Sequence, residues 1–184
     1  MAPVGREMIV LGVDPGTQAT GYGVVSEGAD RILGLIECGA IRPSRAQPLV
    51  KRLLQIFEGV GEVIERTRPD VMCVEGVFYG RNVRTTVVLS HARGVVMLAA
   101  AMRDIAVTEY PPAEVKKAVV GTGAAEKGQV AFMVQQHLGL KAPPSPADAA
   151  DGVAVALCHL FNHRATRRGD GPRGRGGVGR KLQV

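Results

Sequence analysis

The stretch MIVLGVDPGT, residues 8–17, decides the fold of this chain. Five of the six residues from Met8 to Val13 are apolar, and a Pro-Gly turn follows soon after them. An apolar run of this length, bounded by a turn, is typical of a strand that is buried on both faces in the middle of a sheet. The run ends in Asp14. Taken alone, this carboxylate either caps the turn or lies at the edge of the sheet where functional sites are commonly built.

The remaining elements predict an α/β fold with a mixed five-stranded sheet and helices on both of its faces. Three closely spaced strands favour an antiparallel meander, and the strands that follow are separated by helices, which favours parallel crossovers. If the fourth strand lies beside the first, Glu75 and Asp14 emerge at the same end of the sheet. The expected strands are 8–14, 21–26, 31–41, 71–75 and 105–110, and the expected helices are 47–66, 85–103, 111–119, 126–138 and 146–163.

Length and charge divide the chain into one domain and a tail. With 184 residues and 46% apolar content, residues 1–163 are expected to form a single domain with a large core, after a short disordered leader at 1–7. Residues 164–184 are rich in Gly and Arg and are expected to be disordered. This tail holds seven of the 23 basic and one of the 17 acidic residues, so it carries the whole net charge of +6. The domain itself balances, and it can bind an anion only where its charges segregate locally.

Two classes of protein are excluded by the composition. No apolar run is long enough to span a membrane, and the N-terminus lacks the apolar core of a signal peptide. We therefore expect a protein of the cytoplasm without a membrane partner. The three cysteines are far apart and form no C-x-x-C pair, so the sequence indicates neither a disulfide framework nor a zinc site.

Two further carboxylates lie in the last predicted helix, which contains ADAADG. Asp148 and Asp151 are three residues apart and share one face of that helix. Asp148 alone is also explained as a helix cap, but a pair of like charges is tolerated only in solvent or beside a cation. With Asp14 and Glu75 they make four oxygen ligands that suit Mg²⁺ or Mn²⁺. Two such ions about 4 Å apart can catalyse phosphodiester hydrolysis.

Four short motifs in this order resemble the RuvC-type Holliday junction resolvases: D-P-G-T from Asp14, V-E-x-V-F around Glu75, G-x-A-E-K-x-Q-V around Lys127 and D-A-A-D-G from Asp148. These are bacterial crossover junction endodeoxyribonucleases with a ribonuclease H-like fold. The resemblance covers residues 8–163. It implies a metal-dependent endonuclease that resolves four-way DNA junctions by paired symmetric nicks in recombination and DNA repair.

The family's residue roles carry over to matching positions. The resemblance makes Asp14, Glu75, Asp148 and Asp151 both the catalytic residues and the ligands of two Mg²⁺ or Mn²⁺ ions. It implies that Phe78 stacks on the junction and that Lys116 and Lys127 contact DNA. It also implies a homodimer, with the helix at 85–103 in the interface, and a branch-migration helicase as partner. The chain departs from the family pattern at Gly76, where a Gln is expected, and this departure puts the loop that carries Phe78 in question.

The residues themselves support a set of DNA contacts. An aromatic side chain in a polar loop beside Glu75 can stack on an unpaired base, although it can equally pack onto the core. Basic residues nearby can bind phosphates, and for any one of them a solvated surface is the simpler interpretation. The candidates are Phe78, Tyr79, Arg81, Arg84, Lys116, Lys117 and Lys127.

Three other functions compete. D-P-G-T also begins the phosphate loop of actin-like ATPases, but the chain is too short for their duplicated domain. A different nuclease of the ribonuclease H-like fold would keep the carboxylates and act on another nucleic acid. A non-catalytic junction-binding module would keep the fold without using the carboxylates.

Overall fold

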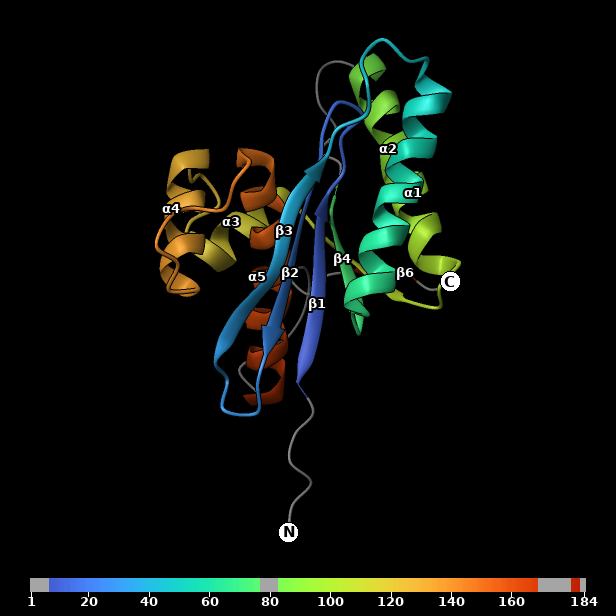
Figure 1. Ribbon diagram of the computed structural model, residues 1–184. Helices are drawn as coiled ribbons and strands as arrows, with labels where there is room; N and C mark the ends of the chain where they lie inside the picture. The colour runs from blue at the N-terminus through green and yellow to red at the C-terminus, as the bar shows by residue number, and fades with distance from the viewer. Residues whose placement is uncertain (1–6, 77–82, 169–179, 183–184) are drawn as a thin grey trace.

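The structure is a computed structural model that describes residues 7–76, 83–168 and 180–182 (Figure 1). Its strands are β1 (Met8–Asp14), β2 (Thr20–Glu27), β3 (Leu33–Ile41), β4 (Val71–Glu75), β5 (Ala106–Tyr110) and β6 (Arg180–Leu182). Its helices are α1 (Leu49–Thr67), α2 (Val83–Ala101), α3 (Pro112–Val120), α4 (Lys127–His137) and α5 (Ala147–Arg168).

The apolar stretch from Met8 to Asp14 forms the central strand. The sheet has the order β3-β2-β1-β4-β5-β6, so β1 has neighbours on both sides. It pairs antiparallel with β2 and parallel with β4, where Val13 lies opposite Val74. Because the next residue of each strand is a carboxylate, Asp14 and Glu75 leave the sheet side by side at the same end. The predicted meander and the predicted crossover to β4 are both confirmed.

Helices cover both faces of the sheet, as predicted. Helices α1 and α2 lie on one face, and α3, α4 and α5 lie on the other (Figure 1). Each face has its own core: Val10 and Cys73 belong to the core under α5, whereas Leu11 and Met72 belong to the core under α1 and α2. None of the described helices is long and apolar enough to cross a lipid bilayer.

Glycines bring α5 unusually close to β1 and β2. A Cβ on Gly12 would overlap the backbone of α5, and a Cβ on Gly21 would overlap the carbonyl oxygen of Asp148. From the helix side, a Cβ on Gly152 would lie 2.5 Å from the Cα of Tyr22. Real Cβ atoms do not approach so closely, so bare backbone on both elements is what allows this packing.

The structure differs from the prediction for the tail. Helix α5 continues to Arg168, beyond the expected end at residue 163, and Arg164 holds it to the sheet through an ion pair with Glu27 (2.8 Å). Residues 180–182 form β6, which pairs antiparallel with β5 and makes the sheet six-stranded rather than five-stranded. The edge of β5 offers backbone N–H and C=O groups that can pair with any segment able to adopt an extended conformation. Composition alone does not reveal that pairing.

Candidate active site

Two carboxylates meet where β1 and β4 end. Side chains alternate along a strand, and Val10 and Gly12 of β1 face α5, so Asp14 also faces α5. The same alternation from Cys73 directs Glu75 of β4 to this face. The two side chains are partly buried and hydrogen-bonded to each other. Among the described residues, Asp14 therefore bonds to Glu75 and not to the turn that follows it.

Burial and nearby negative charge favour the protonated forms of these two carboxyl groups, although the hydrogen bond with Glu75 lowers the pKa of Asp14. Desolvation raises the pKa of Glu75 to about 8, with the negative charges of Asp14 and Asp151 adding to the effect. Desolvation also raises the pKa of Asp14 to about 6, and the charges of Asp151 and Asp148 contribute in the same direction. The ammonium group of Lys127 partly offsets both shifts. The four predicted carboxylates thus interact electrostatically at one end of the sheet.

The other two carboxylates come from α5 and each binds a basic side chain. Asp148 is the second residue of the helix, and its Oδ2 accepts a hydrogen bond from Nη2 of Arg42 (2.5 Å), so the side chain binds an arginine rather than capping the helix. Asp151, one turn later, accepts a bond from Nζ of Lys127 (3.0 Å).

Local sequence explains why Lys127 reaches this place. Glu126 and Gln129 form a reciprocal capping box at the start of α4, in which Gln129 accepts a bond from the backbone of Glu126 (2.8 Å). The capping box therefore makes Lys127 the first residue of α4. Helix α4 packs against α5, which brings Lys127 beside Asp151.

The donor chemistry fits a hard divalent cation. All four side chains offer carboxylate oxygens, and burial, with a smaller contribution from neighbouring carboxylates, raises the pKa values of Asp14 and Glu75, an effect that a bound cation would oppose. As the side chains lie, no three His, Cys, Asp or Glu residues within the described part of the chain surround one point closely enough to hold an ion. Asp148 and Asp151 face Arg42 and Lys127 instead.

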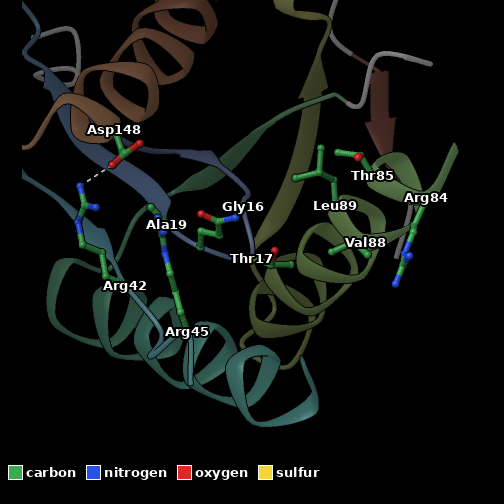
Figure 2. A pocket seen from close by; sticks show the side chains of 11 residues that line it. Gly16, Thr17, Ala19, Arg42, Arg45, Arg84, Thr85, Val88, Leu89 and Asp148 are labelled. Atoms are coloured by element: carbon green, nitrogen blue, oxygen red, sulfur yellow. Dashed lines mark hydrogen bonds and ion pairs between the residues drawn. The ribbon is translucent and has the colours of Figure 1, made fainter. Parts of the chain in front are cut away.

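An open groove of about 560 Å³ adjoins the carboxylates. Figure 2 shows Arg42 joined to Asp148 on one side of this groove and residues of α2 on the other. The sequence analysis missed Arg42 and Arg45, which follow β3. The signal was available, because the segment IRPSR carries two arginines directly after a strand. The groove is lined by Gly16, Thr17, Gln18, Ala19, Arg42, Arg45, Arg84, Thr85, Val88, Leu89 and Asp148.

The predicted DNA contacts fall into three groups. Arg84 lines the groove, and Lys127 lies at the carboxylates. Lys116 and Lys117 lie on α3, and in the described part of the chain no hydrogen bond or ion pair joins them to the carboxylates. The predicted contacts at Phe78, Tyr79 and Arg81 lie outside the described residues.

Gly76, the departure from the family pattern, is enclosed by its neighbours. Its backbone N–H donates to the carbonyl oxygen of Tyr110 (2.8 Å), which continues the pairing of β4 with β5 by one residue. A Cβ at this position would lie 2.7 Å from Oε1 of Glu109, whose carboxylate also pairs with Arg93 of α2. The backbone directly after Glu75 is therefore held by the sheet, and Glu109 occupies the space that a side chain would need.

Comparison with known proteins identifies the family. The family model described as crossover junction endodeoxyribonuclease RuvC matches residues 10–159. The chain is 46% identical over 158 residues to the crossover junction endodeoxyribonuclease RuvC of Syntrophomonas wolfei, an alignment that covers 85% of this chain and 91% of that relative.

Solved structures agree with this result. The Thermus thermophilus RuvC structure superposes with a TM-score of 0.78 at 35% identity, covering 95% of this chain and all of the other. T. thermophilus RuvC in complex with Holliday junction substrate superposes with a TM-score of 0.79 at 32% identity and the same coverage. The fold is therefore the predicted ribonuclease H-like α/β fold, and the chain belongs to the crossover junction endodeoxyribonuclease RuvC family.

Proposed function

We propose that this chain is a structure-specific endonuclease that resolves four-way DNA junctions by paired symmetric nicks in recombination and DNA repair. The single observation that carries the proposal is the meeting of Asp14, Glu75, Asp148 and Asp151 at one end of the sheet, in a member of a family of junction endonucleases. The likeness to a structure titled as a complex with Holliday junction substrate supports the choice of DNA.

We assign the four carboxylates as ligands of two divalent ions, either Mg²⁺ or Mn²⁺. When bound, such ions supply Lewis acidity at the scissile phosphate and lower the pKa of the attacking water. The chain's own part is to hold four oxygen donors on three rigid elements, β1, β4 and α5. Asp14 and Glu75, whose pKa values burial raises, would hold the ions in their ionised forms, and Asp148 and Asp151, which bind Arg42 and Lys127 here, would supply the other oxygen donors.

Arg42 and Lys127 have a further part in this proposal. The ammonium of Lys127 and the guanidinium of Arg42 are both beside the reaction centre and both solvent-exposed on the outer side. A phosphate group would offer these cations negative charge while the carboxylates hold the ions. The two basic side chains would then hold the DNA backbone beside the carboxylates.

A homodimer accounts for two symmetric nicks. A four-way junction has two-fold symmetry, and a C2 dimer presents one site to each of two strands. In support, α2 exposes Val83, Val87 and Leu98, at 73%, 49% and 51% of their surface, and Met102 just after the helix is 66% exposed. These positions recur at intervals of three and four through Ser90 and Gly94, so they share one helix face. We propose that this face is the dimer interface.

We place the enzyme in the cytoplasm, where bacterial DNA lies, and we propose a branch-migration helicase as its partner. The basis for both is the family alone.

The deciding experiment compares the wild type with Asp14→Asn on a labelled synthetic four-way junction in Mg²⁺ or Mn²⁺. Binding and cutting are scored separately, with a linear duplex of the same sequence as the substrate control. Asp104→Asn, which changes an exposed carboxylate after α2, is the matched control variant. We expect symmetric nicks from the wild type and from Asp104→Asn, and binding without cutting from Asp14→Asn. Cutting by Asp14→Asn at the wild-type rate would refute the carboxylate site, and binding without cutting by all three proteins would favour a non-catalytic module.

A further inference from the structure

We propose that the groove beside Asp148 is a phosphate-binding subsite, in which Arg42 and Arg45 hold the backbone of the cleaved strand at a phosphate next to the scissile one. The inference rests on the proposed function and adds a specific role for two arginines that follow β3. Lys127 is not among the residues that line this groove in the described part of the chain.

The groove has the charge that a phosphate requires. Three arginines and one aspartate line it, and the remaining lining residues are uncharged. Residues 1–163 carry no net charge as a whole, so the positive charge of the groove reflects a local clustering of basic residues. The arginines come from two places in the fold: Arg42 and Arg45 from the segment after β3, and Arg84 from the start of α2. A single solvated helix face does not explain arginines that converge from separate elements.

Arg42 is held ready to bind. Its Nη2 donates to Asp148, which fixes the guanidinium at the boundary between the groove and the carboxylates (Figure 2). Its side chain is still 54% exposed, and that bond uses one of its five N–H donors. Within the described ranges, Arg42 makes no second hydrogen bond. An arginine in this state can bind a phosphate by donating two parallel hydrogen bonds, the forked geometry that guanidinium groups favour.

The size of the groove suits part of a DNA backbone rather than a bare ion. Its volume of about 560 Å³ lies in the range of sites that enclose a small molecule, about 300–1,000 Å³. Its floor includes Gly16 to Ala19, the turn that directly follows Asp14. Arg52 of α1 donates to the carbonyl oxygen of Thr17 (3.3 Å) and so supports this turn from below. A backbone that passes the scissile position at Asp14 and continues past Asp148 therefore enters the groove.

The test combines charge-removing variants with single neutral phosphates. Arg42→Gln and Arg45→Gln are compared with Arg68→Gln, an exposed arginine that follows α1 at the opposite end of the sheet. A series of junctions is prepared, and each junction carries a single methylphosphonate at a different position on one or the other side of the scissile phosphate. Junction affinity is measured against salt concentration, and cutting is measured separately as KM and kcat.

We expect the wild type and Arg68→Gln to lose affinity, by about tenfold, at one or two neutral positions next to the scissile phosphate. Arg45→Gln should bind the unmodified junction about tenfold more weakly, with a salt slope reduced by about one ion. A neutral phosphate next to the scissile one should not weaken its binding further. Arg42→Gln should behave likewise and should also lower kcat, because it borders the carboxylates.

Two outcomes would overturn the proposal while the wild type still cuts junctions. In the first, both arginine variants match Arg68→Gln. In the second, the neutral phosphates weaken the variants as much as the wild type. If the wild type itself failed to cut, the failure would lie with the proposed function, and the binding arm would still show whether the two arginines contact a phosphate.

Discussion

The backbone of Gly21 in β2 lies directly against the carbonyl oxygen of Asp148 in α5, so closely that a Cβ on Gly21 would overlap that oxygen. One wall of the carboxylate site thus depends on a missing side chain. Gly152, four residues further along α5, meets the backbone of Tyr22 in the same way. The two contacts set how near α5, and with it Asp148 and Asp151, approaches Asp14.

Adding a methyl group at this contact should move α5 away from the sheet. Gly152→Ala places a Cβ 2.5 Å from the Cα of Tyr22, where backbone cannot yield as a flexible side chain can. We expect a loss of unfolding free energy of at least about 1–3 kcal/mol, the usual cost of overpacking. Cutting should fall further than the lost stability explains, because the carboxylates separate. Denaturant unfolding and cutting rates at a temperature where the variant is folded would measure both.

The control for this variant is Gly128→Ala in α4, where a Cβ would meet open space. There the methyl group should leave stability unchanged or raise it by up to about 1 kcal/mol, since Ala favours a helix over Gly. Equal effects at Gly128 and Gly152 would show that the close approach of α5 does not matter.

Stability without divalent ions should fall as pH rises. Burial raises the pKa of Asp14 from 3.8 to about 6 and that of Glu75 from 4.5 to about 8, so the folded state binds more protons than the unfolded state between about pH 4 and pH 8. Unfolding free energy then decreases with pH across that window, by up to a few kcal/mol. Glu37, whose pKa is lowered by Arg66, acts in the opposite direction but titrates below 4.5.

Thermal unfolding in chelator from pH 4.5 to 8.5 would test this slope. Asp14→Asn should flatten it, since the substitution removes one titrating group and the charge that it places on Glu75. Adding Mn²⁺ should stabilise the wild type most at the alkaline end, where the carboxylates are ionised. A slope that is identical in the wild type and in Asp14→Asn would contradict the assignment of these pKa shifts.

Lys127 should matter for cutting and little for stability. Its side chain is 83% exposed, and an exposed ion pair such as the one with Asp151 contributes at most about 1 kcal/mol. Lys127→Ala should therefore change unfolding free energy by less than that. Its cutting rate should drop by at least about tenfold, which corresponds to ~1.4 kcal/mol of transition-state stabilisation. Single-turnover cutting and denaturant unfolding would be compared with Lys141→Ala, an exposed lysine before α5. Loss of stability without loss of cutting would refute the assignment.

The exposed face of α2 should hold the dimer together. Leu98→Glu places a charge on that face, where an interface would desolvate it, and should raise the dimer dissociation constant by at least about tenfold. Sedimentation at several concentrations would measure the change. Phe132→Glu, at an apolar position of α4 that is 56% exposed, is the control and should leave the dimer intact. If Leu98→Glu and Phe132→Glu behaved alike, the interface would lie elsewhere.

Much of this molecule follows from local patterns in the sequence. The apolar run ending in Asp14 predicts a central strand, and the change to a period of three and four predicts α1. Once β4 lies parallel to β1, the two-residue alternation of a strand puts Asp14 and Glu75 on one face at one end. These features need only the order of elements and the direction of side chains, which short-range periodicity encodes.

Tertiary structure alone decided the rest. The glycines of β1, β2 and α5 meet only because the helix lies across the sheet, a contact between segments more than a hundred residues apart. Arg42 reaches Asp148, and Arg45 joins the same groove, for the same reason. Strand β6 forms because the edge of β5 offers backbone partners, which tail composition does not encode. Such contacts depend on the distance between whole elements, and local propensity carries no information about that distance.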